Sequence, residues 1–188
     1  MKKTLFSLAF VALFSVATTT TVSAQSKTKT VMVGGAAMYP TKNIIENAVN
    51  SKDHTTLVAA VKAAGLVETL QGAGPFTVFA PTNEAFNKLP AGTVETLVKP
   101  ENKATLTKIL TYHVVAGRMT SADIAKAIKA GGGKATFKTV SGGTLTAMMK
   151  GKALELKDEK GGISTVTIAD VLQSNGVIHV VNTVLMPQ

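Results

Sequence analysis

Three histidines, His54, His113 and His179, have the widest range of possible chemistry in this sequence. A histidine can bind a metal ion, transfer a proton, or lie buried and hydrogen-bonded as part of the scaffold. Metal sites need several ligands at close spacing, as in HExxH, and long intervals separate these three residues. The chain has no cysteine, which excludes disulfides and thiolate metal sites. We therefore predict no metal site and no cofactor.

The sequence also lacks the motifs of common nucleophilic enzymes. An α/β-hydrolase places its serine in a GxSxG turn, and no such motif occurs. The glycine-rich stretch at 131–133 lacks the GxxxxGK[ST] spacing of a phosphate-binding loop. Asp53 and Asp123 have the positions of helix caps, and only Asp170 lies close in sequence to a histidine, His179. We predict no catalytic residue and a protein that is not an enzyme.

The first residues have the three parts of a secretory signal peptide. Two lysines precede an apolar run from Leu5 to Ala17, and a polar stretch then ends at Ala24. The apolar run is shorter than the roughly 20 residues needed to cross a bilayer. We predict a signal peptide over residues 1–24 and a mature chain without a transmembrane segment. The protein is expected to be exported, to the periplasm or the extracellular space.

The chain is basic, with a formal net charge of +9, but its charges are not arranged for nucleic acid. Nearly all of the basic residues are lysines, because Arg118 is the only arginine. Lysine is a point charge without the planar geometry that reads phosphates and bases in pairs. Aromatic residues make up 5% of the chain, too few to provide a stacking surface for bases. We predict no nucleic-acid partner and expect a monomer.

The elements that must position these residues fall into two halves. Up to about residue 130, apolar residues recur at helical spacing, which predicts helices within 42–51, 55–65, 83–89, 92–98, 101–113 and 121–130. Asp53 is expected to cap the second helix and Gly65 to end it, and Thr120 with Asp123 has the pattern of a capping box for the last. The stretch from Pro75 to Pro81 alternates instead and predicts a buried strand.

After residue 133 apolar and polar residues alternate to the end of the chain, with glycine turns at 142–143 and 161–162. This pattern predicts a meander of strands. Helices followed by strands indicate an α+β domain in which helices cover an antiparallel sheet. Residues 25–42 are small and glycine-rich and are predicted to be an extended segment ahead of a single domain at 43–188.

Three stretches of the sequence together resemble the signatures of the fasciclin domain family. TVFAPTNEAF (77–86) resembles the first signature, Tyr112-His113 the central pair, and NGVIHVVNTVLMP (175–187) the closing signature. The residues that carry the first and closing signatures are Thr77, Phe79, Pro81, Thr82, Asn83, Phe86, Asn175, Gly176 and His179. The order and spacing agree over about 43–187, and VMVGGAAMYP further resembles the small exported bacterial members.

The resemblance implies a fasciclin-like fold, with N-terminal and central helices packed on an antiparallel β-sandwich or wedge formed mainly by the C-terminal half. It also implies an adhesion module that binds a cell-surface or matrix protein or polysaccharide. Contact with partners is implied for Asp170-Val171-Leu172 and for Tyr112-His113. The alternative is a periplasmic or secreted binder of a polysaccharide or small ligand, for which a large closed pocket would be evidence.

The residues themselves leave two interpretations of this contact segment open. Asp170 precedes a turn at 173–176, so its carboxylate is expected to stay solvated at a strand end beside apolar Val171 and Leu172. In the other interpretation the two apolar residues are core and Asp170 caps the turn. His179 is expected to be a structural strand residue whose ring is hydrogen-bonded by Asn182, or by the first signature at Thr82 or Asn83.

Overall fold

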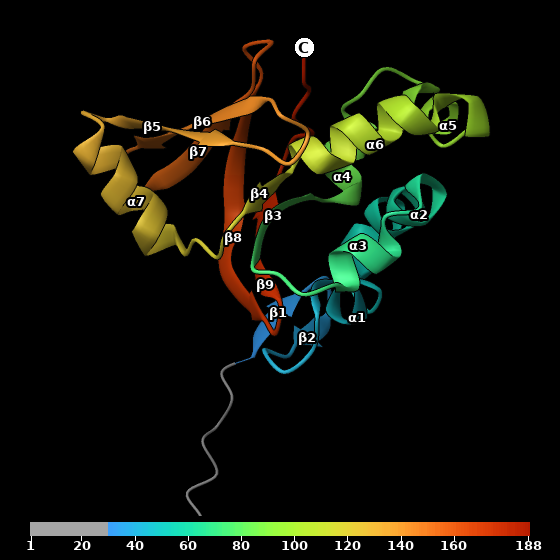
Figure 1. The fold of residues 1–188 in the computed structure, drawn as a ribbon, viewed down its shortest axis with the longest axis horizontal. Coiled ribbons are helices and arrows are strands. Elements are labelled where there is room, and N and C mark those ends of the chain that lie inside the picture. Colours follow the sequence, from blue (N-terminus) through green and yellow to red (C-terminus); the bar gives the residue numbers. More distant parts are fainter. Residues whose placement is uncertain (1–29) are drawn as a thin grey trace, which may run out of the picture.

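Seven strands form the main sheet of the computed structural model, which describes residues 30–188, and helices lie on both sides of this sheet (Figure 1). In order across the sheet the strands are β4 (Val114–Ala116), β3 (Phe76–Pro81), β9 (Gly176–Val181), β8 (Ile163–Gln173), β7 (Ala153–Lys157), β6 (Thr144–Lys150) and β5 (Lys134–Lys138). The predicted signal peptide at 1–24 lies outside the described residues.

The strands from β5 to β9 form the predicted antiparallel meander. The strand predicted between the two prolines is β3, which pairs with β9 in parallel, from Phe76 opposite Gly176 to Pro81 opposite Val181. The sheet is therefore mostly, and not wholly, antiparallel. A single bridge between Val115 and Thr139 brings its two edges together. One neighbour of β9, the strand β3, is distant in sequence, whereas the other, β8, precedes it by a short turn. All residues of β9 are buried, as is usual for a central strand.

The helices are α1 (Ile44–Ala48), α2 (Thr55–Ala64), α3 (Val67–Gln71), α4 (Asn83–Asn87), α5 (Thr93–Leu97), α6 (Lys103–Tyr112) and α7 (Ser121–Ala130), with 3₁₀ turns η1 (Lys52–His54) and η2 (Pro100–Asn102). The capping box of Thr120 and Asp123 and the end of α2 at Gly65 are confirmed. The predicted cap at Asp53 is wrong, because this residue lies inside η1. Across residues 30–188, no helix has the length and apolarity of a membrane span.

The part of the N-terminal segment that is described forms a small hairpin of β1 (Val31–Val33) and β2 (Ala36–Met38). Gly34 in its turn has a φ of 57°, and a Cβ atom there would lie 2.3 Å from Ser51 Oγ, so the turn needs glycine. Val33 and Met38 are each 3% exposed and pack in the core. The hairpin therefore covers one end of the helical layer.

Two apolar clusters lie on opposite faces of β3 and β9. Val78 and Ile178 face the cluster under α1, α2 and α6, whereas Phe79 and Val181 face a second cluster with Ile124 of α7. Alternate residues of one strand point to opposite faces, so the two central strands fill both cores. Figure 1 shows α1 to α6 on one side of β8 and β9 and α7 on the other. The predicted α+β fold is confirmed in this arrangement.

Candidate interaction surface

His179 lies fully buried in the centre of β9 and stacks on Phe79 of β3, with ring centroids 5.7 Å apart. Its Nδ1 accepts a hydrogen bond from the backbone N–H of Asp170 at 3.3 Å. Its Nε2 lies 2.9 Å from the carbonyl of Met119 and therefore carries the proton that it donates. Burial, as the largest cause, lowers the pKa of His179, so the ring is neutral. Each nitrogen is thus bound to backbone.

These partners differ from the predicted ones. Thr82 instead caps α4 by accepting a bond from the N–H of Ala85, and Asn182 accepts one from the N–H of Thr165 at 2.9 Å. The actual partners of His179 are Met119, in the loop before α7, and Asp170, inside β8. No local sequence pattern indicates that either residue contacts the closing signature.

Asp170 occupies a bulge inside β8, which is neither the solvated strand end of the first interpretation nor the turn cap of the second. The pairing of β8 with β9 shifts register between Ile168 and Val171, and Asp170 between them has a φ of 59°. It is the one residue other than glycine with positive φ in the described chain. Its half-buried carboxylate accepts bonds from the N–H of Ser121, at 2.6 Å, and from the Ser121 hydroxyl. Asp170 therefore fastens β8 to the first residue of α7.

A serine, a histidine and an aspartate thus meet here, but their bonds do not form a nucleophile–base–acid chain. The Ser121 hydroxyl donates to Asp170 and not to an imidazole. The proton-accepting Nδ1 of His179 is occupied by a backbone N–H. A hydrolytic triad needs the serine on one histidine nitrogen and the carboxylate on the other. The cluster has the connectivity of a structural joint between β8, β9 and α7.

Tyr112 and His113 lie at the end of α6, and both side chains are buried. The Tyr112 hydroxyl donates to the carbonyl of Thr144 at 2.6 Å and accepts from the N–H of Glu159. Burial, as the largest cause, raises the pKa of Tyr112 to about 12. His113 donates from Nδ1 to the carbonyl of Ile109 and accepts at Nε2 from the N–H of Leu185 at 3.0 Å. These rings hold neighbouring segments and lie below the surface.

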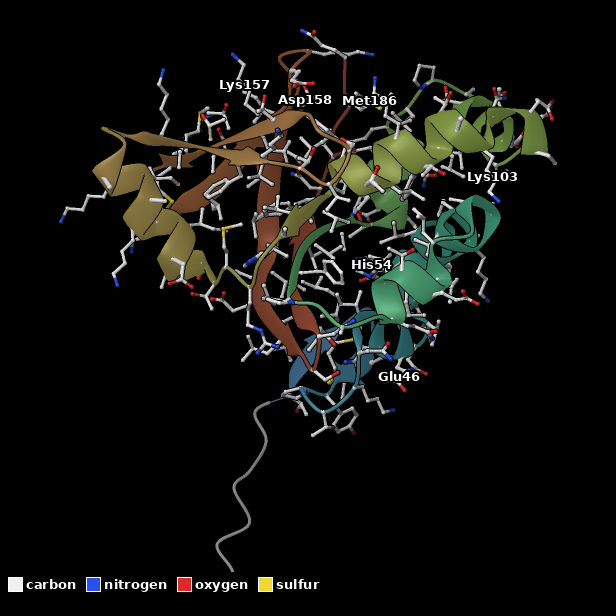
Figure 2. All side chains as sticks on the ribbon, in the orientation of Figure 1. Glu46, His54, Lys103, Lys157, Asp158 and Met186 are labelled. Atoms are coloured by element: carbon white, nitrogen blue, oxygen red, sulfur yellow. The ribbon has the colours of Figure 1, made fainter. Side chains whose placement is uncertain are left out.

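The C-terminal segment is tied to the same region by an acidic pair. The buried carboxylate of Asp158 accepts bonds from the N–H groups of Gly162, at 2.6 Å, and Met186, at 2.9 Å. Figure 2 shows Asp158 and Met186 side by side at the end of the molecule opposite β1. Glu159 accepts from Thr144, which lowers the pKa of its exposed carboxyl. The central Tyr-His pair and this acidic pair together hold the chain after β9 in place.

The other signature residues also have structural contacts. Asn175 donates to the carbonyls of Leu70 and Gly72 and accepts from the N–H of Ile44, which joins β9 to α1 and α3. The Thr77 hydroxyl donates to the carbonyl of Gly117 at 2.6 Å. Asn83 accepts a bond from the N–H of Thr56 and donates one to the carbonyl of Lys52. Gly176 lies close to the Phe76 carbonyl. The remaining signature residues are buried, namely Phe79, Pro81 and Phe86.

His54, the third histidine, is labelled in Figure 2 and borders a small interior cavity that residues of α1 and α2 line. Its Nδ1 lies 2.9 Å from Ser51 Oγ, and its buried Nε2 has no hydrogen-bond partner. Burial, as the largest cause, lowers its pKa, and the nearby carbonyl of Ala80 opposes that shift. The cavity measures about 40 Å³ and is lined almost wholly by apolar side chains. This space admits a few atoms and no sugar ring.

The segment 170–172 is only partly at the surface. Val171 is 1% exposed and packs with the helical layer, whereas Leu172 points to the other face of β8 and is 38% exposed. Arg118, which is exposed, donates from Nη2 to the carbonyls of Gln173 and Ser174. The end of β8 is thus held by Arg118 on one side of Leu172 and by Ser121 on the other. The contacts of Arg118 and Ser121 were not predicted, because the capping box of Thr120 and Asp123 was the only pattern recognised in this region.

Comparison with known proteins gives this geometry its context. The profile of the fasciclin domain matches residues 52–187. The chain is 46% identical to protein sll1483 of Synechocystis sp. over 188 aligned residues, which cover 96% of this chain and 95% of that one. It is 37% identical to the immunogenic protein MPB70 of Mycobacterium bovis, over 74% of this chain and 66% of that one. It is 39% identical to the transforming growth factor-beta-induced protein ig-h3 of Sus scrofa, over 70% of this chain and 17% of that one.

The fold has a solved counterpart as well. The chain superposes on a FAS1 domain pair from the insect cell adhesion molecule fasciclin I with a TM-score of 0.70 and 17% identity. The superposition covers 79% of this chain and 52% of the domain pair, so this chain spans about half of that structure. The sequence signatures, the matched profile and the fold agree: the chain belongs to the fasciclin domain family.

Proposed function

We propose that the protein is an exported, non-catalytic adhesion module that attaches to a cell-surface or matrix partner through the end of β8. The observation that carries this proposal is the exposure of Leu172, a large apolar side chain that is 38% exposed. Hydrogen bonds of Asp170 with Ser121 and of Gln173 with Arg118 hold the backbone before and after it. A fixed contact residue loses little conformational entropy on binding, which favours affinity. Arg118 beside it adds a positive charge to the same surface.

The family supports this class of function. Fasciclin domains are adhesion-type domains, and the solved counterpart comes from an insect cell adhesion molecule. A relative from Mycobacterium bovis is named as a cell surface glycolipoprotein, MPB83, and is 35% identical over 88% of this chain. The signal-peptide pattern of residues 1–24 supports export, to the periplasm or beyond.

Within the proposal Asp170, Tyr112 and His113 act as supports of the contact surface. Asp170 sets the position of Leu172, and Tyr112 with His113 holds segments behind the sheet. A polysaccharide or small-ligand binder is the alternative function. It draws less support because the interior cavity of about 40 Å³ is far smaller than a sugar, and the hollow of about 380 Å³ beside β8 is an open groove and not the closed pocket that such a binder would need.

A capture experiment with a matched control tests the proposal. The mature chain, residues 25–188, is immobilised and incubated with cell-envelope and matrix extracts, as wild type, Leu172→Glu and Ile163→Glu. Ile163 is 49% exposed at the opposite end of β8 and serves as the control. We expect Leu172→Glu to reduce retention of the partner by about tenfold, as for a central contact residue, and Ile163→Glu to leave it unchanged.

Two results would contradict the proposal. Wild-type protein that retains no component at physiological salt is one of them. Equal retention by the two variants is the other, because nonspecific attraction by the lysines would then account for binding.

A further inference from the structure

The longest strand, β8, has an edge that β7 covers only at its start and that no other described strand covers further on. β8 is an eleven-residue strand, and β7 pairs with it only at Ile163, Ser164 and Thr165. From Val166 on, β8 pairs only with β9, on its opposite edge, among the described residues. Register shifts follow Val166 and Ile168, and such bulges leave backbone groups outside the ladder. An open edge of this kind is a template for another extended chain.

A groove of about 380 Å³ runs beside this edge, between α7 and the start of β7. Small residues form much of its lining, with Ala122 and Ala125 on α7, Ala153 on β7 and Ala169 on β8. A strand added to β8 would lie roughly 4.8 Å from it, and short side chains in the walls leave room for its backbone. Met149 also lines the groove, is 41% exposed, and offers a flexible apolar surface for alternate side chains of such a strand.

The exposed charged side chains nearest the groove that have no ion-pair or hydrogen-bond partner among residues 30–188 are lysines. Lys152 lines it, and Lys126 and Lys129 follow the two groove-lining alanines of α7 by four residues, one helical turn further on. All three lysines are exposed. Three carboxylates lie close in sequence to the groove lining, and each already has a partner. Asp123 accepts from Thr120 in the capping box, Asp170 accepts from Ser121, and Glu155 forms an ion pair with Lys150 at 3.7 Å. The groove therefore complements a chain that carries negative charge.

We infer that β8 receives an extended, acidic peptide segment of a partner protein as an added strand, in the groove between α7 and β7. Backbone hydrogen bonds to the open edge around Val166–Ala169 would hold the peptide, and its carboxylates would face Lys152 and the lysines of α7. The inference rests on the proposed interaction function and specifies the chemistry of the partner. It concerns a different surface from Leu172.

A defined probe tests the inference. A synthetic peptide of about six residues that alternates glutamate with valine is titrated into the mature chain, and backbone amide NMR shifts are followed. We expect shifts at residues 166–169 and around Ala125, with saturation below about 1 mM at low salt. The same peptide with lysine in place of glutamate should bind at least about tenfold more weakly because its charges are repelled.

Two pairs of variants locate the site. Ala125→Phe fills the groove and should abolish the shifts, whereas Ala130→Phe, also exposed on α7 but outside the groove lining, should not. Lys152→Glu should weaken the peptide about threefold or more, and Lys62→Glu on α2 should not. All four positions are exposed, and Lys152 lies in the turn before β7, so the variants should fold.

The inference is overturned if the glutamate peptide causes no shifts at 166–169 at about 1 mM, or if the lysine peptide binds as well. It is also overturned if the NMR shifts at 166–169 follow the protein concentration and not the peptide concentration, and vanish in Ala125→Phe. Such a result would mean that the edge of β8 pairs with a second copy of this chain. Partner capture that is lost in Leu172→Glu but kept in Ala125→Phe would leave the proposed function standing without the strand site. Peptide binding without any capture of an envelope or matrix partner would leave the strand site without the proposed function.

Discussion

His113 and His179 are neutral and use opposite tautomers. His113 donates from Nδ1 and accepts at Nε2, whereas His179 accepts at Nδ1 and donates from Nε2. All four partners are backbone groups. A protonated ring would lose its accepted bond, so proton transfer at either residue would break the scaffold. These two histidines therefore stabilise the fold in our account.

Removal of the His179 ring should destabilise the protein substantially. His179→Ala leaves the Met119 carbonyl and the Asp170 N–H unpaired and opens a cavity beside Phe79, which we expect to lower the free energy of unfolding by about 3 kcal/mol. Urea unfolding measures the change. His54→Ala is the matched control, because only one ring nitrogen of His54, the Nδ1 atom next to Ser51, has a partner to lose, and its cost should be smaller. Equal unfolding midpoints for His179→Ala and wild type would contradict this role.

Asp170 is expected to matter for stability through the shape of its side chain. Asp170→Ala removes the acceptor of Ser121 and places alanine at a φ of 59°, so it should cost about 2 kcal/mol. Asp170→Asn keeps an acceptor oxygen and tolerates this conformation, so it should cost less than half of that. Thermal or urea unfolding of both variants is the measurement. If Asp170→Ala were as stable as wild type, the contact between β8 and α7 would not contribute to the free energy of unfolding, which would contradict this role of Asp170.

At the level of single residues, local pattern was informative for burial and for helix ends, such as the capping box of Thr120 and Asp123. The run of β-branched apolar residues in GVIHVV correctly indicates that His179 lies on a buried strand. It contains no information on Met119 or Ser121, because those contacts depend on how the loop before α7 meets β8. The same limit explains Asp170, whose position before a turn suggested a free carboxylate. The bulge that turns this carboxylate toward α7 is a product of the pairing with β9.

Among the elements, the parallel pair of β3 and β9 was the least predictable from sequence. Helical periodicity located most helices, although the five-residue α3 was missed because it spans little more than one turn. The meander followed from alternation and glycine turns. Pairing of β3 with β9, in contrast, joins segments about a hundred residues apart, and nothing local in either strand specifies its neighbour or direction.

The close contact of Gly176 with β3 provides a test of this pair. A Cβ atom on Gly176 would lie 2.2 Å from the Phe76 carbonyl oxygen, so Gly176→Ala must push the two strands apart. We expect a loss of about 3 kcal/mol, the upper part of the range for overpacking. Gly72→Ala is the control, because a Cβ atom there would be 3.3 Å from its nearest neighbour and φ is −62°. A nearly neutral Gly176→Ala in urea unfolding would show that the parallel register is wrong.

For the whole molecule, the buried histidines predict a loss of stability in mild acid. Burial lowers the pKa of His113 to about 4, although the carboxylate of Asp158 opposes part of that shift. In the unfolded chain a histidine takes up its proton near pH 6.5. Between these values the unfolded state binds more protons than the folded state, so the free energy of unfolding falls as the pH falls.

His113 alone should therefore reduce the free energy of unfolding by about 2 kcal/mol between pH 7 and pH 5, and burial of His54 and His179 acts in the same direction. Urea titrations at the two pH values measure this difference. His113→Gln should show a smaller drop between them, whatever its stability at pH 7. A wild-type free energy of unfolding that rises or stays constant toward pH 5 would contradict neutral burial of these rings.

The central claim is that the protein attaches through a fixed surface at the end of β8 and performs no chemistry. Its most direct test is attachment under flow of beads coated with the mature protein to cells or matrix, for wild type, Leu172→Glu and Ile163→Glu at physiological salt. Our account predicts attachment of the wild type and of Ile163→Glu, with loss of about nine in ten attached beads for Leu172→Glu. Attachment that is the same for all three proteins, or absent for the wild type, would contradict it.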